Sequence, residues 1–243
     1  MSPSKVSESA KSARAVRNEQ ADKLFIAELQ FRLASAVRVA TTFKNQPLDL
    51  PTRWSHGRHS VSHGEIALRP DQADVAARFL HRSATYLLAV AIKDALKLVF
   101  IDPKNSSDAN IQSAYQIARL IRNAFTHSPF APVWSIDPDC RDKVFSIPDV
   151  VSLDASALHG KKFDWRHYGG PLALLKLCRF VRGDLLGVDL TRTKKVPPPK
   201  TDIIQMGDMI LKRIARIPKN AKRVKVKRDK AGRIDLGGGY SIG

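Results

Sequence analysis

The segment AYQIARLIRNAFTHSPFAPVW, residues 114–134, determines the fold that we expect for this chain. Its apolar residues recur at three- and four-residue steps, the spacing that places side chains on one face of an α-helix. They are Ala114, Ile117, Ile121, Ala124 and Phe125. The Ser-Pro pair at 128–129 ends this helix, because proline lacks an N–H donor and disfavours the α region for the residue before it. Arg122, Asn123 and His127 therefore lie near one helix end.

These three side chains form a candidate active site. Near neutral pH a histidine can exchange a proton with a ribose 2′-hydroxyl, and an arginine can bind the phosphate and stabilise charge on it. The combination suits RNA cleavage without a metal ion, with Asn123 as a positioning group. The alternative is structural: Arg122 and Asn123 cap neighbouring carbonyl groups, and His127 closes the helix.

The spacing of the two charged side chains constrains this hypothesis. Arg122 and His127 are five residues apart, so on a regular helix their side chains point about 140° apart. Three arrangements could still bring them to one phosphate. His127 lies beyond the last turn, or the long Arg122 side chain reaches round the helix, or two copies of the motif face each other across a symmetric dimer.

Three more helices are expected around this one. The first spans residues 17–43, the second begins at Pro70 and runs to about residue 101, and the last covers residues 171–186. Three short β-type runs precede the last helix, at 133–136, 144–147 and 150–153. The predicted fold class is mainly α, a bundle of about four helices with a small β insertion and a basic C-terminal extension.

Composition divides the chain into three regions. Residues 1–16 are rich in Ser, Ala and Lys without aromatic residues, and we expect them to be disordered. Residues 17–187 form the helical domain, and residues 188–243 form a basic tail that includes the proline-rich linker at 194–200. Within the tail, residues 202–217 have the spacing of a short amphipathic helix.

The net charge of +18 over 243 residues indicates a polyanionic partner, and RNA is the partner that we expect. The tail contributes nine Lys and six Arg against five Asp. Its residues 222–228 alternate between basic residues and valine, which predicts an extended arm on nucleic acid. The contacts would come from Lys222, Arg223, Lys225, Lys227 and Arg228. The alternative is a tail that only aids solubility.

A second candidate site is the aromatic turn at 163–168. Arg166 and His167 offer a cation and an imidazole just before a helix N-terminus, where anions are favoured. The neighbouring aromatic rings offer a surface on which a base can stack. The structural alternative, which we prefer on the sequence alone, is that Phe163 and Trp165 anchor the loop on the core.

Other features argue against membrane, secreted and disulfide-stabilised proteins. No apolar run approaches the roughly 20 residues of a membrane span, and we see no apolar signal-peptide region. Cys140 and Cys178 make neither a disulfide framework nor a metal site, so we expect packing roles and a reducing, cytoplasmic location.

Three histidines lie in the polar segment 48–69: His56, His59 and His63. A zinc site needs about four ligands, and no cysteine lies nearby to complete a familiar pattern. Gly57 and Gly64 favour a flexible loop for this segment. We therefore expect no metal and no cofactor.

The six residues 122–127, RNAFTH, resemble the signature of the HEPN superfamily, an arginine and a polar residue followed after a few positions by a histidine. The resemblance covers residues 70–187 and implies a compact bundle of about four helices. Carried over by position, Arg122 and His127 would be the catalytic pair and Asn123 the supporting polar residue. The β insertion and the basic tail depart from the usual family pattern.

The resemblance also implies a type of activity and partners. Many members of the superfamily are metal-independent endoribonucleases that act as homodimers, often as toxins countered by an antitoxin or as effectors of phage defence. Others have lost activity and bind nucleotides or partner proteins. A HEPN-like endoribonuclease is therefore the expected function, and an inactive module that binds nucleic acid or a partner is the alternative.

Overall fold

The computed structural model describes residues 3–43, 52–188 and 190, and beyond them only the four short strands between residues 201 and 242. The chain divides into two units, Met1–Leu190 and Thr191–Gly243. The first unit holds all of the candidate site residues that the structure describes.

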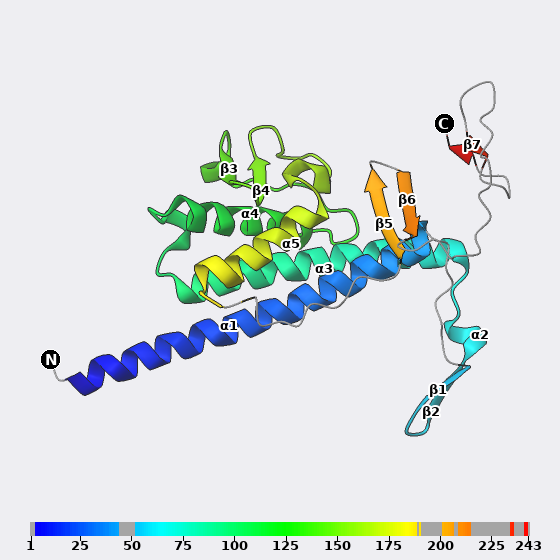
Figure 1. Cartoon of the computed structure of the whole chain (residues 1–243), viewed down its shortest axis with the longest axis horizontal. Coiled ribbons are helices and arrows are strands. Elements are labelled where there is room, and N and C mark those ends of the chain that lie inside the picture. Colours follow the sequence, from blue (N-terminus) through cyan, green and yellow to red (C-terminus); the bar gives the residue numbers. More distant parts are fainter. Residues whose placement is uncertain are drawn as a thin grey trace. The chain divides into compact units, whose positions relative to one another are not determined.

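Four substantial helices form the first unit, and the predicted mainly α fold is confirmed (Figure 1). They are α1 (Pro3–Arg38), α3 (Pro70–Val99), α4 (Ala109–Thr126) and α5 (Pro171–Phe180). Helices α1 and α3 run antiparallel along each other. Helices α4 and α5 both pack against α3, and α5 also reaches α1.

Short turns extend or connect these helices. The π-helical turns η1 (Val39–Phe43) and η5 (Val181–Leu185) prolong α1 and α5, so both helical segments end within about one residue of the expected position. The other short elements are α2 (His63–Ile66) and the 3-10 turns η2 (Pro103–Asn105), η3 (Pro138–Cys140) and η4 (Trp165–Tyr168).

Within the described residues, the strands pair as four two-stranded antiparallel sheets. The pairs are β1 (Arg53–His56) with β2 (His59–Ser62), β3 (Val144–Ile147) with β4 (Val151–Asp154), β5 (Thr201–Met206) with β6 (Met209–Ile214), and β7 (Ile234–Asp235) with β8 (Ser241–Ile242). The β3–β4 hairpin is the predicted β insertion. The third β-type run, at 133–136, contributes only an isolated bridge between Val133 and Lys162.

The N-terminal region differs from the expectation of disorder over residues 1–16. The structure continues α1 back to Pro3, without a break before Arg38. No glycine or internal proline interrupts residues 4–38, and Ala, Lys, Arg, Glu and Gln are good helix formers. The lack of aromatic residues led to the expectation of disorder, whereas intrinsic helix propensity favours the helix.

Two other local predictions are wrong. The segment expected to be a flexible loop forms the β1–β2 hairpin and α2, with Gly57 at a φ of 55° in the tight turn that pairs His56 with His59. The amphipathic helix expected at 202–217 is the β5–β6 hairpin over residues 201–214. A Gly-Asp pair lies between those strands in the sequence, which is a two-residue hairpin signal that apolar spacing alone overlooks.

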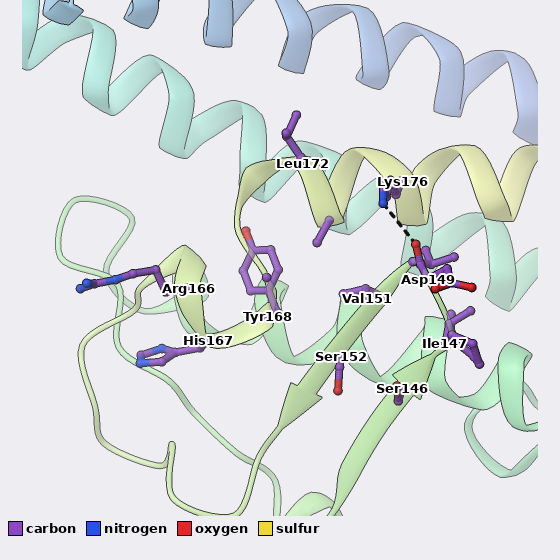
Figure 2. A pocket seen from close by; sticks show the side chains of 14 residues that line it. Ser146, Ile147, Asp149, Val151, Ser152, Arg166, His167, Tyr168, Leu172 and Lys176 are labelled. Carbon is purple, nitrogen blue, oxygen red and sulfur yellow. Dashed lines mark hydrogen bonds between the residues drawn. The ribbon is translucent and has the colours of Figure 1, made fainter. Parts of the chain in front are cut away.

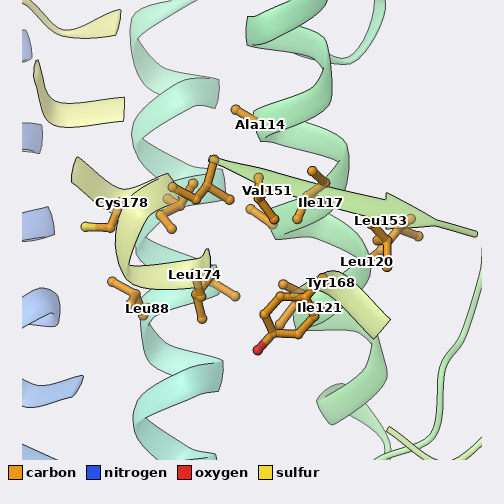
Figure 3. Close-up of a cluster of buried hydrophobic side chains, with 14 of the residues drawn as sticks. Leu88, Ala114, Ile117, Leu120, Ile121, Val151, Leu153, Tyr168, Leu174 and Cys178 are labelled. Carbon is orange, nitrogen blue, oxygen red and sulfur yellow. The ribbon is translucent and has the colours of Figure 1, made fainter. Parts of the chain in front are cut away.

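The core lies where α3, α4 and α5 meet the inner face of the β3–β4 hairpin (Figure 3). Alternate residues of the two strands are buried in this core: Phe145, Ile147, Val151 and Leu153. Helix α4 buries the apolar face that the sequence predicts, including Ala114, Ile117 and Ile121. The side chain of Asp108 accepts hydrogen bonds from the N–H groups of residues 110 and 111, and this cap fixes the start of α4.

A buried carboxylate connects α1 to the α5 segment. The side chain of Glu28 is 3% exposed, and it accepts hydrogen bonds from Arg179 at 2.9 Å and from Arg182 at 2.7 Å. Its neighbour one turn along α1, Arg32, lies 3.9 Å away. A buried charge is tolerated only when it is paired, so this contact fixes the register of the two helices.

The two cysteines are buried and free, which confirms their predicted packing role. Burial raises the pKa of the Cys178 thiol to about 12, so this thiol stays protonated at neutral pH. Over the described part of the chain, we find no helix with the length and apolar character needed to cross a bilayer.

Candidate active site

Helix α4 stays regular to its end at Thr126. His127 follows as the C-cap residue with α-helical dihedral angles, a φ of −91° and a ψ of −26°. The 140° separation expected between the Arg122 and His127 side chains therefore persists. His127 is exposed, whereas Arg122 and Asn123 are half-buried.

Arg122 and Asn123 belong to a side-chain network on one side of α4. Arg122 Nη1 donates to Asn123 Oδ1 at 3.1 Å, and Asn123 Nδ2 donates to Asp137 Oδ2 at 3.1 Å. Arg119 Nη2 also lies 3.2 Å from that Asp137 oxygen and contacts Asp139. Asn123 thus links the Arg122 guanidinium to Asp137, and these hydrogen bonds join side chains rather than capping carbonyl groups.

A cavity of about 260 Å³ lies at the end of α4, and two histidines line it. Its lining is Ala124, His127, Ser128, Val133, Trp134, Ser135, His159 and Gly160. Arg122 does not line this cavity, so a single chain brings His127 to His159 rather than to Arg122. His159 was not predicted as a site residue.

Backbone pairing between two distant segments builds this cavity. The Val133 N–H donates to the carbonyl of Ala124 at 3.1 Å, which folds the chain back after the helix end. The Trp134 N–H donates to the carbonyl of Lys161 at 2.8 Å, and the Gly160 N–H donates to the carbonyl of Trp134 at 2.9 Å. These bonds hold the segment containing His159 beside the end of α4.

Hydrogen bonds fix the tautomers of two imidazoles here. The Ile136 N–H donates to His159 Nδ1 at 3.2 Å, and Trp134 Nε1–H donates to His167 Nδ1 at 2.8 Å. Because Nδ1 accepts in both rings, the neutral ring carries its proton on Nε2. Each Nε2–H is then a hydrogen-bond donor.

The aromatic turn contributes both to the core and to the site. Phe163 and Tyr168 are buried and Trp165 packs against the core, so the anchoring role is confirmed for this turn. The same turn also brings His167 to Trp134, a residue that lines the cavity of His127. The structural and functional interpretations of this turn are therefore compatible.

A second cavity, of about 570 Å³, is lined by residues of η4, the β3–β4 hairpin and α5 (Figure 2). Arg166 and His167 extend from η4 at one end of it, and Lys176 of α5 lies at the other end, donating to the Asp149 carbonyl at 3.2 Å. Arg166 pairs with Asp164, and that hydrogen bond lowers the pKa of the Asp164 carboxyl to about 2. The carboxylate of Asp164 thus neutralises much of the positive charge of Arg166 within the turn.

The predicted tail contacts lie outside the described residues: Lys222, Arg223, Lys225, Lys227 and Arg228. Within the described ranges, no three or more His, Cys, Asp or Glu side chains come together in a way that could hold a metal ion.

Comparison with protein-family models, with curated proteins and with solved structures finds no match to this chain. The function proposed below therefore rests on the residues of the chain itself.

Proposed function

We propose that this protein is a metal-independent endoribonuclease of the HEPN type. One observation carries the proposal: His127 and His159 line a single cavity at the end of α4. Arg122 and Asn123 belong to the last turns of the same helix but do not line the cavity. The strongly basic composition is what an enzyme acting on a polyanion needs.

In the proposed reaction, His127 transfers both protons. Its neutral ring removes the proton from a ribose 2′-hydroxyl, and the 2′-oxygen attacks the adjacent phosphorus. The bond from phosphorus to the 5′-oxygen breaks, and the imidazolium returns its proton to that oxygen. The products are a 2′,3′-cyclic phosphate and a 5′-hydroxyl, so the step consumes neither water nor a metal ion. His127 suits this role because it is exposed at the cavity.

The other side chains have supporting roles in this mechanism. His159 Nε2–H is a donor that can bond a phosphate oxygen, since Nδ1 of this ring is occupied by a backbone N–H. Arg122 does not line the cavity of its own chain, so it would clamp the phosphate bound at the cavity of a second copy. Asn123 holds that guanidinium in place.

A cleavage assay on single-stranded RNA with EDTA present tests the proposal. We expect the full-length protein to cleave, and His127→Ala to lose at least about 100-fold in rate, the usual contribution of a general acid–base group. His63→Ala is the matched control, because His63 is an exposed histidine on α2. Equal activity of wild type and His127→Ala, or no activity in either, contradicts the proposal.

A non-enzymatic module that binds nucleic acid is the second candidate. The observation that favours it is the Arg122–Asn123–Asp137 network, which holds the predicted catalytic arginine without His127. A binding module of this kind should bind RNA in a salt-dependent way and should not cleave it. Its affinity for RNA should not change in Arg122→Ala. Cleavage that is lost in His127→Ala excludes it.

A further inference from the structure

Three arginines gather where the end of α1 meets the first half of α3. Arg38 comes from α1, and Arg78 and Arg82 lie one turn apart on α3. Arg78 pairs with Asp74 at 2.5 Å, and Thr42 donates to the same carboxylate. The charges of Arg78 and Arg38 both act on the Asp74 carboxylate, and Arg82 lies near both arginines.

Arg38 and Arg82 are held by neutral partners rather than by an acid. Arg38 lies over the Trp165 ring at 4.9 Å and donates from Nη1 to His81 Nδ1 at 3.2 Å. Arg82 lies over the Phe79 ring at 5.3 Å and donates from Nη1 to the Phe130 carbonyl at 2.9 Å. These stacking and hydrogen-bond contacts orient both groups, and within the described residues neither guanidinium forms an ion pair with a carboxylate.

The electrostatics of the cluster agree with this excess of positive charge. Burial lowers the pKa of Arg38, and repulsion from Arg78 and Arg82 lowers it further, while Asp74 opposes the shift. Among the described residues, the buried Nε atom of Arg82 has no hydrogen-bond acceptor. That Nε atom is not accessible to solvent, so an outside anion would be bound by the terminal nitrogens of the guanidinium groups and by their positive charge.

Two contacts connect this cluster to the histidine cavity. Arg82 donates to the carbonyl of Phe130, which follows His127 by three residues. The Cα atoms of Phe130 and His127 are therefore at most roughly 11 Å apart. On the other side, Trp165 beneath Arg38 belongs to the same short turn as His167, whose ring accepts from Trp134 of the cavity. The chain around Phe130 and the turn of Trp165 and His167 thus link the arginine cluster to the segments that line the histidine cavity.

We propose that Arg38, Arg78 and Arg82 form a phosphate-binding subsite that holds a backbone phosphate of the RNA strand next to the bond being cut. This assignment rests on the proposed ribonuclease function and supplies a phosphate contact from the same chain as His127. Arginine suits it because a planar guanidinium presents several donors to phosphate oxygens. The aromatic rings beneath Arg38 and Arg82 keep these donors in position.

Binding of a 2′-O-methyl oligoribonucleotide to the full-length protein tests the subsite. Such a strand lacks the attacking hydroxyl, so binding is measured without cleavage. We expect Arg78→Ala to raise Kd by about three- to tenfold and to lower the salt slope by about 0.7 for one lost phosphate contact. The side chain of Arg78 is 48% exposed, so the variant should fold.

Lys97→Ala is the matched control, because it removes one exposed positive charge from the other end of the same helix. Arg82→Lys is a second variant, which keeps the charge, loses the fork of donors and should also bind more weakly. Equal affinities of Arg78→Ala and Lys97→Ala overturn the subsite. Displacement of the oligonucleotide by inorganic phosphate at the same phosphate concentration overturns its assignment to an RNA backbone.

The subsite and the ribonuclease can fail separately. If Arg78→Ala weakens binding but no RNA is cleaved, the phosphate site stands and the catalytic proposal falls. If cleavage depends on His127 and Arg78→Ala binds like Lys97→Ala, the catalytic proposal stands and the subsite falls.

Discussion

Two clusters that include residues of α1 each contain three arginines and one carboxylate, but their ion pairs and hydrogen bonds differ. At Glu28 all three arginines lie within 4 Å of the carboxylate, whose side chain is buried. Around Asp74, Arg78 alone of the described residues forms an ion pair with the carboxylate, and Arg38 and Arg82 bond to neutral acceptors. Both sites stack an arginine on an aromatic ring, Arg182 on Phe25 in the first and Arg38 on Trp165 in the second.

The difference shows that burial of the acid, rather than the number of charges, separates a structural site from a binding site. A carboxylate buried between helices must be paired, so the arginines around Glu28 are committed to the fold. A carboxylate at the edge of a cluster binds one arginine and leaves the others able to bind an outside anion. Substitutions should therefore change stability at the first site and binding at the second.

The largest effect on stability is expected for Glu28→Gln. Removing the buried negative charge leaves Arg182, whose side chain is 9% exposed, without its ionic partner. Breaking a buried ion pair in this way costs about 3–5 kcal/mol, which corresponds to a fall in Tm of roughly 6–20 °C for a chain of this size. Thermal unfolding followed by circular dichroism measures it.

The matched control is Glu19→Gln, which breaks an exposed pair with Lys23 on the same helix and should shift Tm by less than about 2 °C. Glu28→Leu combined with Arg182→Leu should recover part of the lost stability, because an apolar pair can replace a buried ion pair. A Tm for Glu28→Gln equal to that of Glu19→Gln would mean that the buried pair does not hold α1 to α5.

The next largest effect is a loss of stability in acid from His81, whose Nδ1 accepts a hydrogen bond from Arg38. Burial and then the charge of Arg38 lower the pKa of His81 from 6.5 to about 4. Between these values the unfolded chain binds more protons than the folded one, so the free energy of unfolding falls as the pH falls from about 6.5 to about 4. The total loss is on the order of 3 kcal/mol.

His81→Phe removes this titration while keeping a ring between Phe31 and Trp165, which both contact His81. Urea unfolding of wild type and variant at pH 7.5 and pH 4.5 should show a smaller loss of stability in the variant. Identical losses in the two proteins would show that His81 does not titrate between these values.

The smallest effect on stability is expected at the second site, from Arg78→Ala. The Arg78 side chain is 48% exposed, so its removal should shift Tm by less than about 2 °C while weakening RNA binding. A fall in Tm as large as that of Glu28→Gln would show that the arginine cluster is structural.

Much of the fold could be predicted because its signals are local. The spacing of apolar residues over 114–125 gives α4, and Pro70 and Asp108 mark the starts of α3 and α4. Local signals gave the wrong element in 201–214, because the same apolar residues fit either a helix or a hairpin. Residues 3–16 show the same limit, since helix propensity alone builds that part of α1.

The candidate site was predictable only in part, because long-range pairing assembles it. The sequence singled out Arg122, Asn123 and His127 from one helix end, and the first two are joined by a hydrogen bond. It could not show that the chain after α4 pairs with residues 160–162, which brings His159 to His127. Nor could it show that antiparallel packing of α1 on α3 places Arg38 beside Arg82.

The most direct test is an NMR titration of the full-length protein with the 2′-O-methyl oligoribonucleotide, observing arginine Nε–H and histidine ring signals. We predict that the signals of Arg38, Arg82 and His127 shift together as the strand binds, while those of Arg179 and Arg182 stay in place. Shifts at Arg179 and Arg182 without shifts at Arg38 and Arg82, or binding that leaves His127 unchanged, would contradict the account.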